Sequence, residues 1–184
     1  MTIEGPLVKN KGSFIISARR TYIDLIMKAA IPDSSPFAGS SYFFYDVNAK
    51  FNYKLGDKDR IFLSGYYGKD VFSFKDNKGG FGVNMPWGNG IAALRWNHLF
   101  TNKLFMNVTG TFSDYMFKFG SQQDQFRFEL ASGIRDVGGK VDFSYFPNSK
   151  HRMKWGADYI YHTFTPSSVS AQSDTHNTAN TVTC

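Results

Sequence analysis

Cysteine and long apolar segments are what this sequence lacks most. Its one cysteine, Cys184, can form no disulfide within the chain, which excludes a disulfide framework. The four histidines have no cysteine, aspartate or glutamate at metal-ligand spacing, so we expect neither a metal site nor a cofactor. No stretch approaches the roughly 18 consecutive apolar residues of a membrane-spanning helix. Disulfide-rich domains and helical membrane proteins are therefore not indicated.

Catalytic motifs are absent as well. The glycine-rich segment 79–82 is not followed by a helical pattern, so it does not indicate a phosphate-binding loop. Asp57 and Asp59 lie in a short turn segment, where such residues more often hydrogen-bond the backbone than bind calcium. We therefore do not expect an enzyme.

The net charge of +6 is not concentrated anywhere in the chain. Nucleic-acid binding proteins gather lysine and arginine on one face or in one run, whereas here they are spread through turns and strands. The sequence thus indicates charges on a wet surface, and no nucleic-acid partner is expected.

Aromatic residues are abundant, at 17% of the chain, and they alternate with polar residues. The clearest case is the segment 42–55, where alternate positions are apolar and the positions between them polar. The apolar set is Phe43, Tyr45, Val47, Ala49, Phe51, Tyr53 and Leu55, and the polar set is Asp46, Asn48, Lys50, Asn52 and Lys54. Period-two alternation over this length predicts a strand longer than the roughly 5–6 residues usual in soluble sheets.

The alternation recurs along the chain. It is clear in segments 103–113, 136–145 and 152–162, weaker in 89–100, and interrupted in 60–74 at Lys69, where we expect a β-bulge. The apolar sets contain no Asp, Glu, Lys or Arg. A lipid-facing strand surface requires this, because a lysine or arginine at mid-bilayer costs roughly 2–4 kcal/mol.

Short and long connections alternate between these segments. The short ones are 9–12, 56–59, 101–103 and 147–151, and the long ones are 21–41, 75–88 and 119–132. Outer-membrane barrels have tight turns at one end and long loops at the other. The sequence therefore predicts an all-β, antiparallel transmembrane β-barrel meander of about eight strands. We expect residues 1–165 to form a partial barrel domain and residues 166–184 a polar, truncated outer loop.

A short amphipathic helix is predicted in the first long connection. Tyr22, Leu25, Ile26 and Ala29 share one helical face, and Pro32 ends the pattern. We expect this face to pack within the loop.

Three groups of residues are candidates for functional positions. Arg19 and Arg20 lie at the outer rim, where they could contact an anionic ligand or lipopolysaccharide. The favoured interpretation is ion pairing with Asp24 or with a neighbouring strand. The predicted lumen-facing residues are Asp46, Lys50, Arg95, Asp142 and Lys154. The predicted aromatic girdle at the membrane interface consists of Tyr42, Phe43, Trp87 and Trp96.

Several stretches resemble the TonB-dependent receptors of the bacterial outer membrane, especially the large importers of Bacteroidetes-type bacteria. These stretches are residues 4–7, 13–22, 45–50, 63–70, 132–136 and 159–164. The resemblance implies a barrel of about 22 strands with a plugged lumen. It also implies import of a scarce nutrient, such as a glycan or siderophore, across the outer membrane of a Gram-negative bacterium. The implied partners are outer-membrane lipid, a plug domain and an inner-membrane energy-coupling complex.

The chain departs from the whole receptor of that family. It has no plug domain, and residues 1–6 lack the basic and apolar regions of a signal peptide. We therefore expect an open part of the larger barrel, with the leader removed or the chain internal to a longer protein. Two alternatives stay open. One is a stand-alone barrel of about eight strands with a structural or adhesive role, and the other is a soluble lipid-binding barrel.

Overall fold

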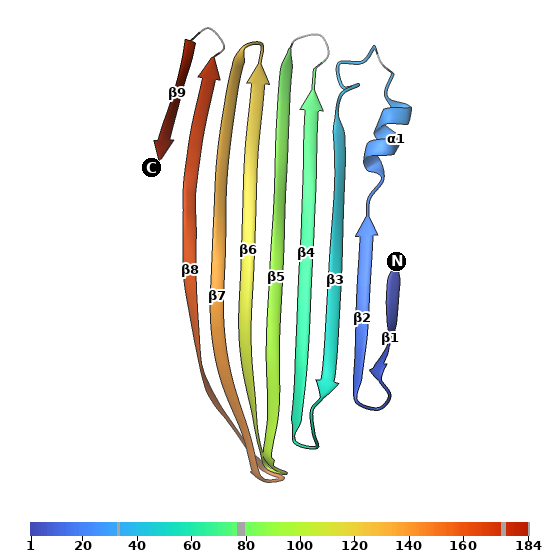
Figure 1. Ribbon diagram of the computed structural model, residues 1–184, viewed down its shortest axis with the longest axis vertical. Coiled ribbons are helices and arrows are strands. Elements are labelled where there is room, and N and C mark those ends of the chain that lie inside the picture. Colours follow the sequence, from blue (N-terminus) through green and yellow to red (C-terminus); the bar gives the residue numbers. More distant parts are fainter. Residues whose placement is uncertain (33, 77–79, 174–175, 184) are drawn as a thin grey trace.

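The computed structural model describes the backbone of residues 1–32, 34–76, 80–173 and 176–183, with side chains up to residue 170. The described chain forms one nine-stranded sheet in which each strand pairs antiparallel with the next (Figure 1). The strands are β1 (Thr2–Val8), β2 (Gly12–Arg20), β3 (Ser41–Lys54), β4 (Asp59–Lys75), β5 (Phe81–Thr101), β6 (Leu104–Gln123), β7 (Phe126–Asn148), β8 (His151–Ser173) and β9 (His176–Thr183). The prediction of an all-β antiparallel meander is confirmed.

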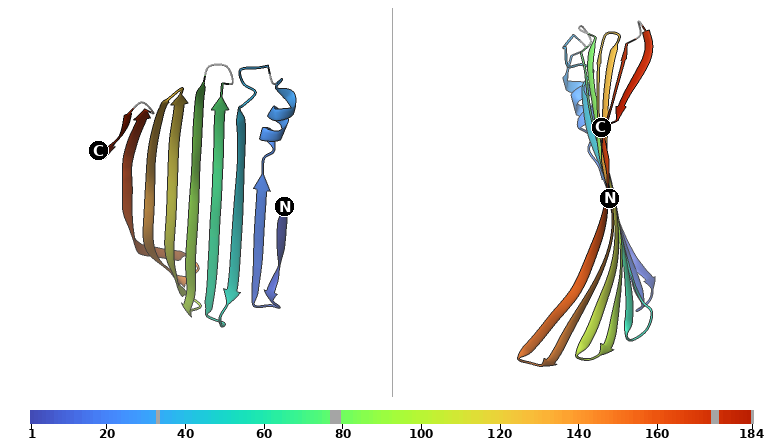
Figure 2. Two further views of the ribbon diagram at one scale, coloured as in Figure 1. Left: turned by 45° about the horizontal axis from the view of Figure 1, so that its top comes forward. Right: turned by 90° about the vertical axis from the view of Figure 1, so that its left-hand side faces the viewer.

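The sheet is a single layer without a hydrophobic core. Among the side chains that the structure describes, no apolar one is buried. The sheet twists so strongly that its two ends splay in different directions when it is seen edge-on (Figure 2), as the right-handed twist of long strands requires. In the described chain, β1 and β9 lie at opposite edges of the sheet and do not pair with each other. The described sheet is therefore open, with unpaired strands at both edges.

Tight turns lie at one end of the sheet, hereafter the turn end, and are drawn at the bottom of Figure 1. They join β1 to β2, β3 to β4, β5 to β6 and β7 to β8, as predicted. The opposite end, hereafter the loop end, differs from expectation. β5 starts already at Phe81, and only residues 124–125 separate β6 from β7, so the long breaks expected at 75–88 and 119–132 are mostly strand. Polar and glycine residues continue the ladder there because strand pairing uses backbone groups that every residue except proline supplies in full.

The polar tail also differs from the predicted loop. Residues 166–173 continue β8, and residues 176–183 form β9, with Val169 paired to Val182. The segment is rich in threonine, a β-branched residue that favours extended backbone even where no periodicity is visible.

The bulge expected at Lys69 is absent. β4 pairs with β3 and with β5 without a register shift, and Lys69 lies opposite Tyr45 and Gly88. The interruption of the apolar–polar alternation at Lys69 therefore has a cause other than a bulge.

The predicted helix is present as α1 (Ile23–Ala30), beside the loop end of β3. Its expected orientation is wrong. Asp24 and Met27 are the partly buried residues, whereas Leu25 is 57% and Ile26 66% exposed. Arg20 at the end of β2 explains this, because its guanidinium binds the Asp24 carboxylate at 2.9 Å and turns the apolar side of α1 outward.

Candidate functional site

Strand register divides the side chains between two faces of the sheet. Residues directly opposite each other in an antiparallel ladder share a face, so the pairing can be followed from strand to strand in rows. One row contains Ala49, Gly65, Ala92, Phe112, Val137 and Tyr161, and we call its side of the sheet the apolar face. Another contains Asn52, Phe62, Arg95, Thr109, Lys140 and Asp158, and we call its side the polar face.

The middle of the apolar face carries no formal charge. Its two further central rows contain Phe51, Leu63, Leu94, Gly110, Gly139 and Tyr159, and Tyr53, Ile61, Trp96, Val108, Val141 and Ala157. On β4 the uncharged band ends at Asp59 toward the turns and at Lys69 toward the loops. That interval matches the roughly 9–11 residues that a tilted strand needs to cross hydrocarbon. The face has the composition and height of a lipid-contacting band.

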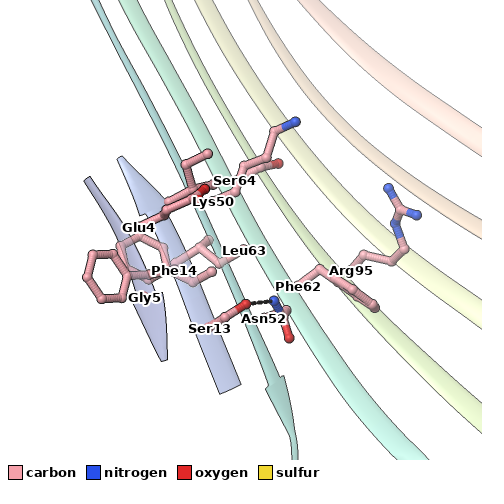
Figure 3. Close-up of a pocket in the computed structure, with 12 residues that line it drawn as sticks. Glu4, Gly5, Ser13, Phe14, Lys50, Asn52, Phe62, Leu63, Ser64 and Arg95 are labelled. Atoms are coloured by element: carbon pink, nitrogen blue, oxygen red, sulfur yellow. Dashed lines mark hydrogen bonds between the residues drawn. The ribbon is translucent and has the colours of Figure 1, made fainter. Parts of the chain in front are cut away.

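All five predicted lumen-facing residues lie together on the polar face. Lys50 and Arg95 line one shallow pocket of about 700 Å³, which Figure 3 shows, and both side chains project from the same side of the sheet. Arg95 and Asp142 line a second hollow of about 360 Å³. Lys154 lies outside both pockets, opposite Ser144 on β7. The five residues thus share one face of the sheet and come from four strands, β3, β5, β7 and β8.

Asp46 is the most enclosed carboxylate of this wall. Its side chain is only 7% exposed, and the Arg19 Nε donates to its Oδ2 at 2.5 Å. Arg19 itself is 70% exposed and lies over the Phe44 ring, 5.4 Å from the ring centroid. A carboxylate removed from water needs such a partner, and Arg19 supplies it.

Arg20, the next residue, serves the opposite face. It pairs with Asp24 and its guanidinium lies 5.3 Å from the centroid of the Phe43 ring on the apolar face. Consecutive residues of a strand point to opposite sides, so the two rim arginines cannot form one site. Arg20 is ion-paired with Asp24, and Arg19 is ion-paired with Asp46 of the neighbouring strand β3. The sequence favoured ion pairing of this kind.

The four predicted girdle aromatics divide between the faces. Phe43 and Trp96 lie on the apolar face, and the Trp96 indole nitrogen donates to Asp59 at 2.9 Å. Tyr42 and Trp87 lie on the polar face, where their rings stack with centroids 6.5 Å apart. The register therefore leaves only Phe43 and Trp96 where a girdle against lipid requires them.

An aromatic patch at the loop end of the polar face was missed by the sequence analysis. Tyr42 and Trp87 belong to it, and the Tyr42 hydroxyl donates to Asp70 at 3.0 Å. The patch includes Tyr42, Phe44, Phe72, Phe74, Phe81, Trp87, Phe117, Phe119 and Phe128. Toward the loop end the apolar face gains charges while the polar face becomes aromatic. This exchange begins beside Lys69, and it explains the interrupted alternation there.

Other polar contacts lie on the polar face and in the turn after β3. On the polar face, the Asp136 carboxylate lies 2.7 Å from the His162 ring nitrogen Nδ1, and it accepts a long hydrogen bond of 3.4 Å from Ser113 Oγ. In the turn after β3, the Lys54 ammonium lowers the pKa of the exposed Asp57 carboxyl. Within the described residues, no three His, Cys, Asp or Glu side chains are grouped closely enough to hold a metal ion.

Within the same residues, the structure contains no helix that is long and apolar enough to span a membrane.

Comparison with known proteins gives one structural likeness. No protein-family model and no curated protein matches the chain. Among solved structures, it is similar to the ferric yersiniabactin uptake receptor FyuA from Yersinia pestis, with a TM-score of 0.61 and 12% sequence identity. The match covers 95% of this chain and 30% of that receptor. At this identity the likeness shows a shared fold, with this chain spanning about a third of the length of the receptor.

Proposed function

We propose that this chain is a segment of the wall of a TonB-dependent outer-membrane receptor that imports a scarce nutrient. The observation that carries the proposal is the two-faced register. One face is free of charge over the height of a hydrocarbon core, and the other is wet and charged at the same height. The shared fold with an uptake receptor supports the same assignment.

The two faces define the environment of each side of the wall. The apolar face contacts outer-membrane lipid, because lysine or arginine is costly there and none occurs in its central rows. The polar face lines the lumen, where Lys50, Arg95 and Asp142 are available to a plug domain of the parent protein. Energy would reach the receptor from an inner-membrane complex through the rest of that protein. The finer resemblance to Bacteroidetes-type importers stays a prediction, as does the nature of the nutrient.

An open sheet supports a larger barrel. In a larger barrel, β1 and β9 would each pair with a further strand. That pairing would satisfy the edge backbone groups with which lipid cannot form hydrogen bonds. A stand-alone small barrel would instead require these two strands to pair.

The orientation of the faces is tested by spin labels in the full-length protein reconstituted in vesicles, in a background with Cys184 replaced by serine. Labels at Leu94, Val108 and Val137 on the apolar face should relax with oxygen, which concentrates in lipid. Labels at Ala93 and Thr109 on the polar face should relax with a water-soluble nickel complex. The opposite pattern, with water on the apolar face, would establish a soluble barrel and overturn the proposal.

Import itself is tested in cells. A strain that lacks the full-length gene should lose growth or uptake on one scarce nutrient among ferric siderophores and glycans. Abolishing the inner-membrane energy supply should cause the same loss while leaving the receptor in the membrane. Unchanged uptake for every nutrient after deletion would contradict an importing role.

A further inference from the structure

A groove lies at the loop end of the apolar face, on strands β4 to β8. It encloses about 610 Å³. Two pairs of small residues leave room for it, Gly88 with Gly90 on β5 and Ala131 with Gly133 on β7. Larger residues at these four positions would fill the space, so the groove is a consequence of the sequence.

Three cations line this groove from three strands. They are Lys69 of β4, Lys118 of β6 and Arg135 of β7. Arg135 is held by Asp114, with its Nη2 2.7 Å and its Nε 3.0 Å from one carboxylate oxygen, and its side chain remains 59% exposed. Among the ion pairs of the described residues, none includes Lys69 or Lys118. The groove therefore carries an excess of positive charge with free ammonium groups.

The groove is continuous with the uncharged band below it. Tyr67 and Met116 form its walls and are 51% and 52% exposed, and Phe112 and Val137 continue the apolar surface in the next row toward the turn end. A ligand that fits both parts has an anionic head at the cations and a hydrocarbon tail over the band. Ammonium and guanidinium groups bind phosphate oxygens through charge-assisted hydrogen bonds, which are stronger in the low dielectric near lipid.

We propose that this groove is a binding site for a phosphorylated lipid of the outer leaflet. Its phosphate lies between Lys69 and Lys118 within reach of Arg135, and its acyl chains lie over Phe112 and Val137. This inference rests on the proposed function, because it requires the apolar face to be in the membrane.

The test uses the full-length protein in detergent and measures binding of bisphosphorylated lipid A by native mass spectrometry. The variant Lys69→Gln with Lys118→Gln should lower the affinity roughly tenfold or more, since it removes two charge-assisted contacts. The matched control Lys50→Gln with Lys154→Gln removes the same charge from the polar face and should bind like the unchanged protein. Equal binding by the groove variant would overturn the site.

A second variant keeps the charges and fills the space. A Cβ at Gly90 would meet nothing nearer than the Tyr67 ring at 3.7 Å, so Gly90→Leu can be accommodated while its side chain occupies the groove. It should also weaken binding of lipid A. Lipid A binding that survives both variants would overturn the proposal even if one of them folds poorly.

Two further measurements complete the test. The first asks whether the groove recognises the lipid or phosphate alone, and the second separates failure of the lipid site from failure of the proposed function. Inorganic phosphate at millimolar concentration should not displace lipid A, and displacement would show a simple anion site instead. If the Leu94 label is in lipid but the groove variants bind normally, only the lipid site is wrong. If the Leu94 label is in water, the proposed function fails as well.

Discussion

At the residue scale, the odd or even position of a residue in its strand decides which face of the sheet carries its charge. Arg19 and Arg20 are neighbours in the sequence, yet one completes the polar wall with Asp46 and the other secures α1 through Asp24. Their chemistry could be anticipated, since both were expected to be ion-paired. The identity of the first partner could not, because Asp46 is 27 residues away and meets Arg19 only through the pairing of β2 with β3.

The Arg19–Asp46 pair gives a prediction of stability. Arg19→Gln leaves an enclosed carboxylate without its partner and should lower the denaturant midpoint of the full-length protein. The double variant with Asp46→Asn should recover much of the loss, since no buried charge remains. Denaturant titration of the folded protein measures both values. Lys54→Gln, which removes a pair with an almost fully exposed carboxylate, is the control and should leave the denaturant midpoint nearly unchanged.

At the scale of elements, the hairpins are determined by their turns as much as by their strands. Asn10, in the turn between β1 and β2, has a φ of 62°, in the left-handed region. Asparagine tolerates this conformation better than most residues, whereas a β-branched residue does not. This turn sets the register in which Ile3 lies opposite Ile16.

Asn10→Val should therefore destabilise the first hairpin by about 1–2 kcal/mol, while Asn10→Gly should be neutral or slightly stabilising. Hydrogen exchange of the β1 and β2 amides in the full-length protein measures the local effect. Lys9→Val changes a neighbouring turn residue without a positive φ and serves as the control. Equal protection in the valine and glycine variants at position 10 would show that this turn does not set the register.

At the scale of the whole molecule, the sheet has two unpaired edges and no core of its own. In the described chain no second layer of strands or helices covers the faces, and outer backbone groups are unpaired along β1, along β9 and along the part of β8 that β9 does not reach. Under the proposed function, stability comes from lipid on one side, from neighbouring protein on the other, and from strands beyond the edges.

Residues 1–184 expressed alone should consequently fail to form a monomeric folded sheet. In detergent, the segment should aggregate or remain without the heat-resistant mobility of a closed barrel, whereas the full-length protein should show that mobility. Electrophoresis with and without heating, with circular dichroism beside it, compares the two. A stable monomer with protected β1 and β9 amides would mean that the sheet closes on itself, which favours the stand-alone barrel.

The sequence by itself determined the fold class, the alternation of β3 and the tight turns, because strand periodicity and turn chemistry are local properties of the chain. It also identified Asp46, Lys50, Arg95, Asp142 and Lys154 as one wall, since parity within a strand reveals which residues share a face. Only the tertiary structure decided how the strands line up. Register depends on hydrogen bonds between segments far apart, so it alone brought the Tyr42 and Trp87 rings together. The same register gathered Lys69, Lys118 and Arg135 around a groove that no single strand reveals.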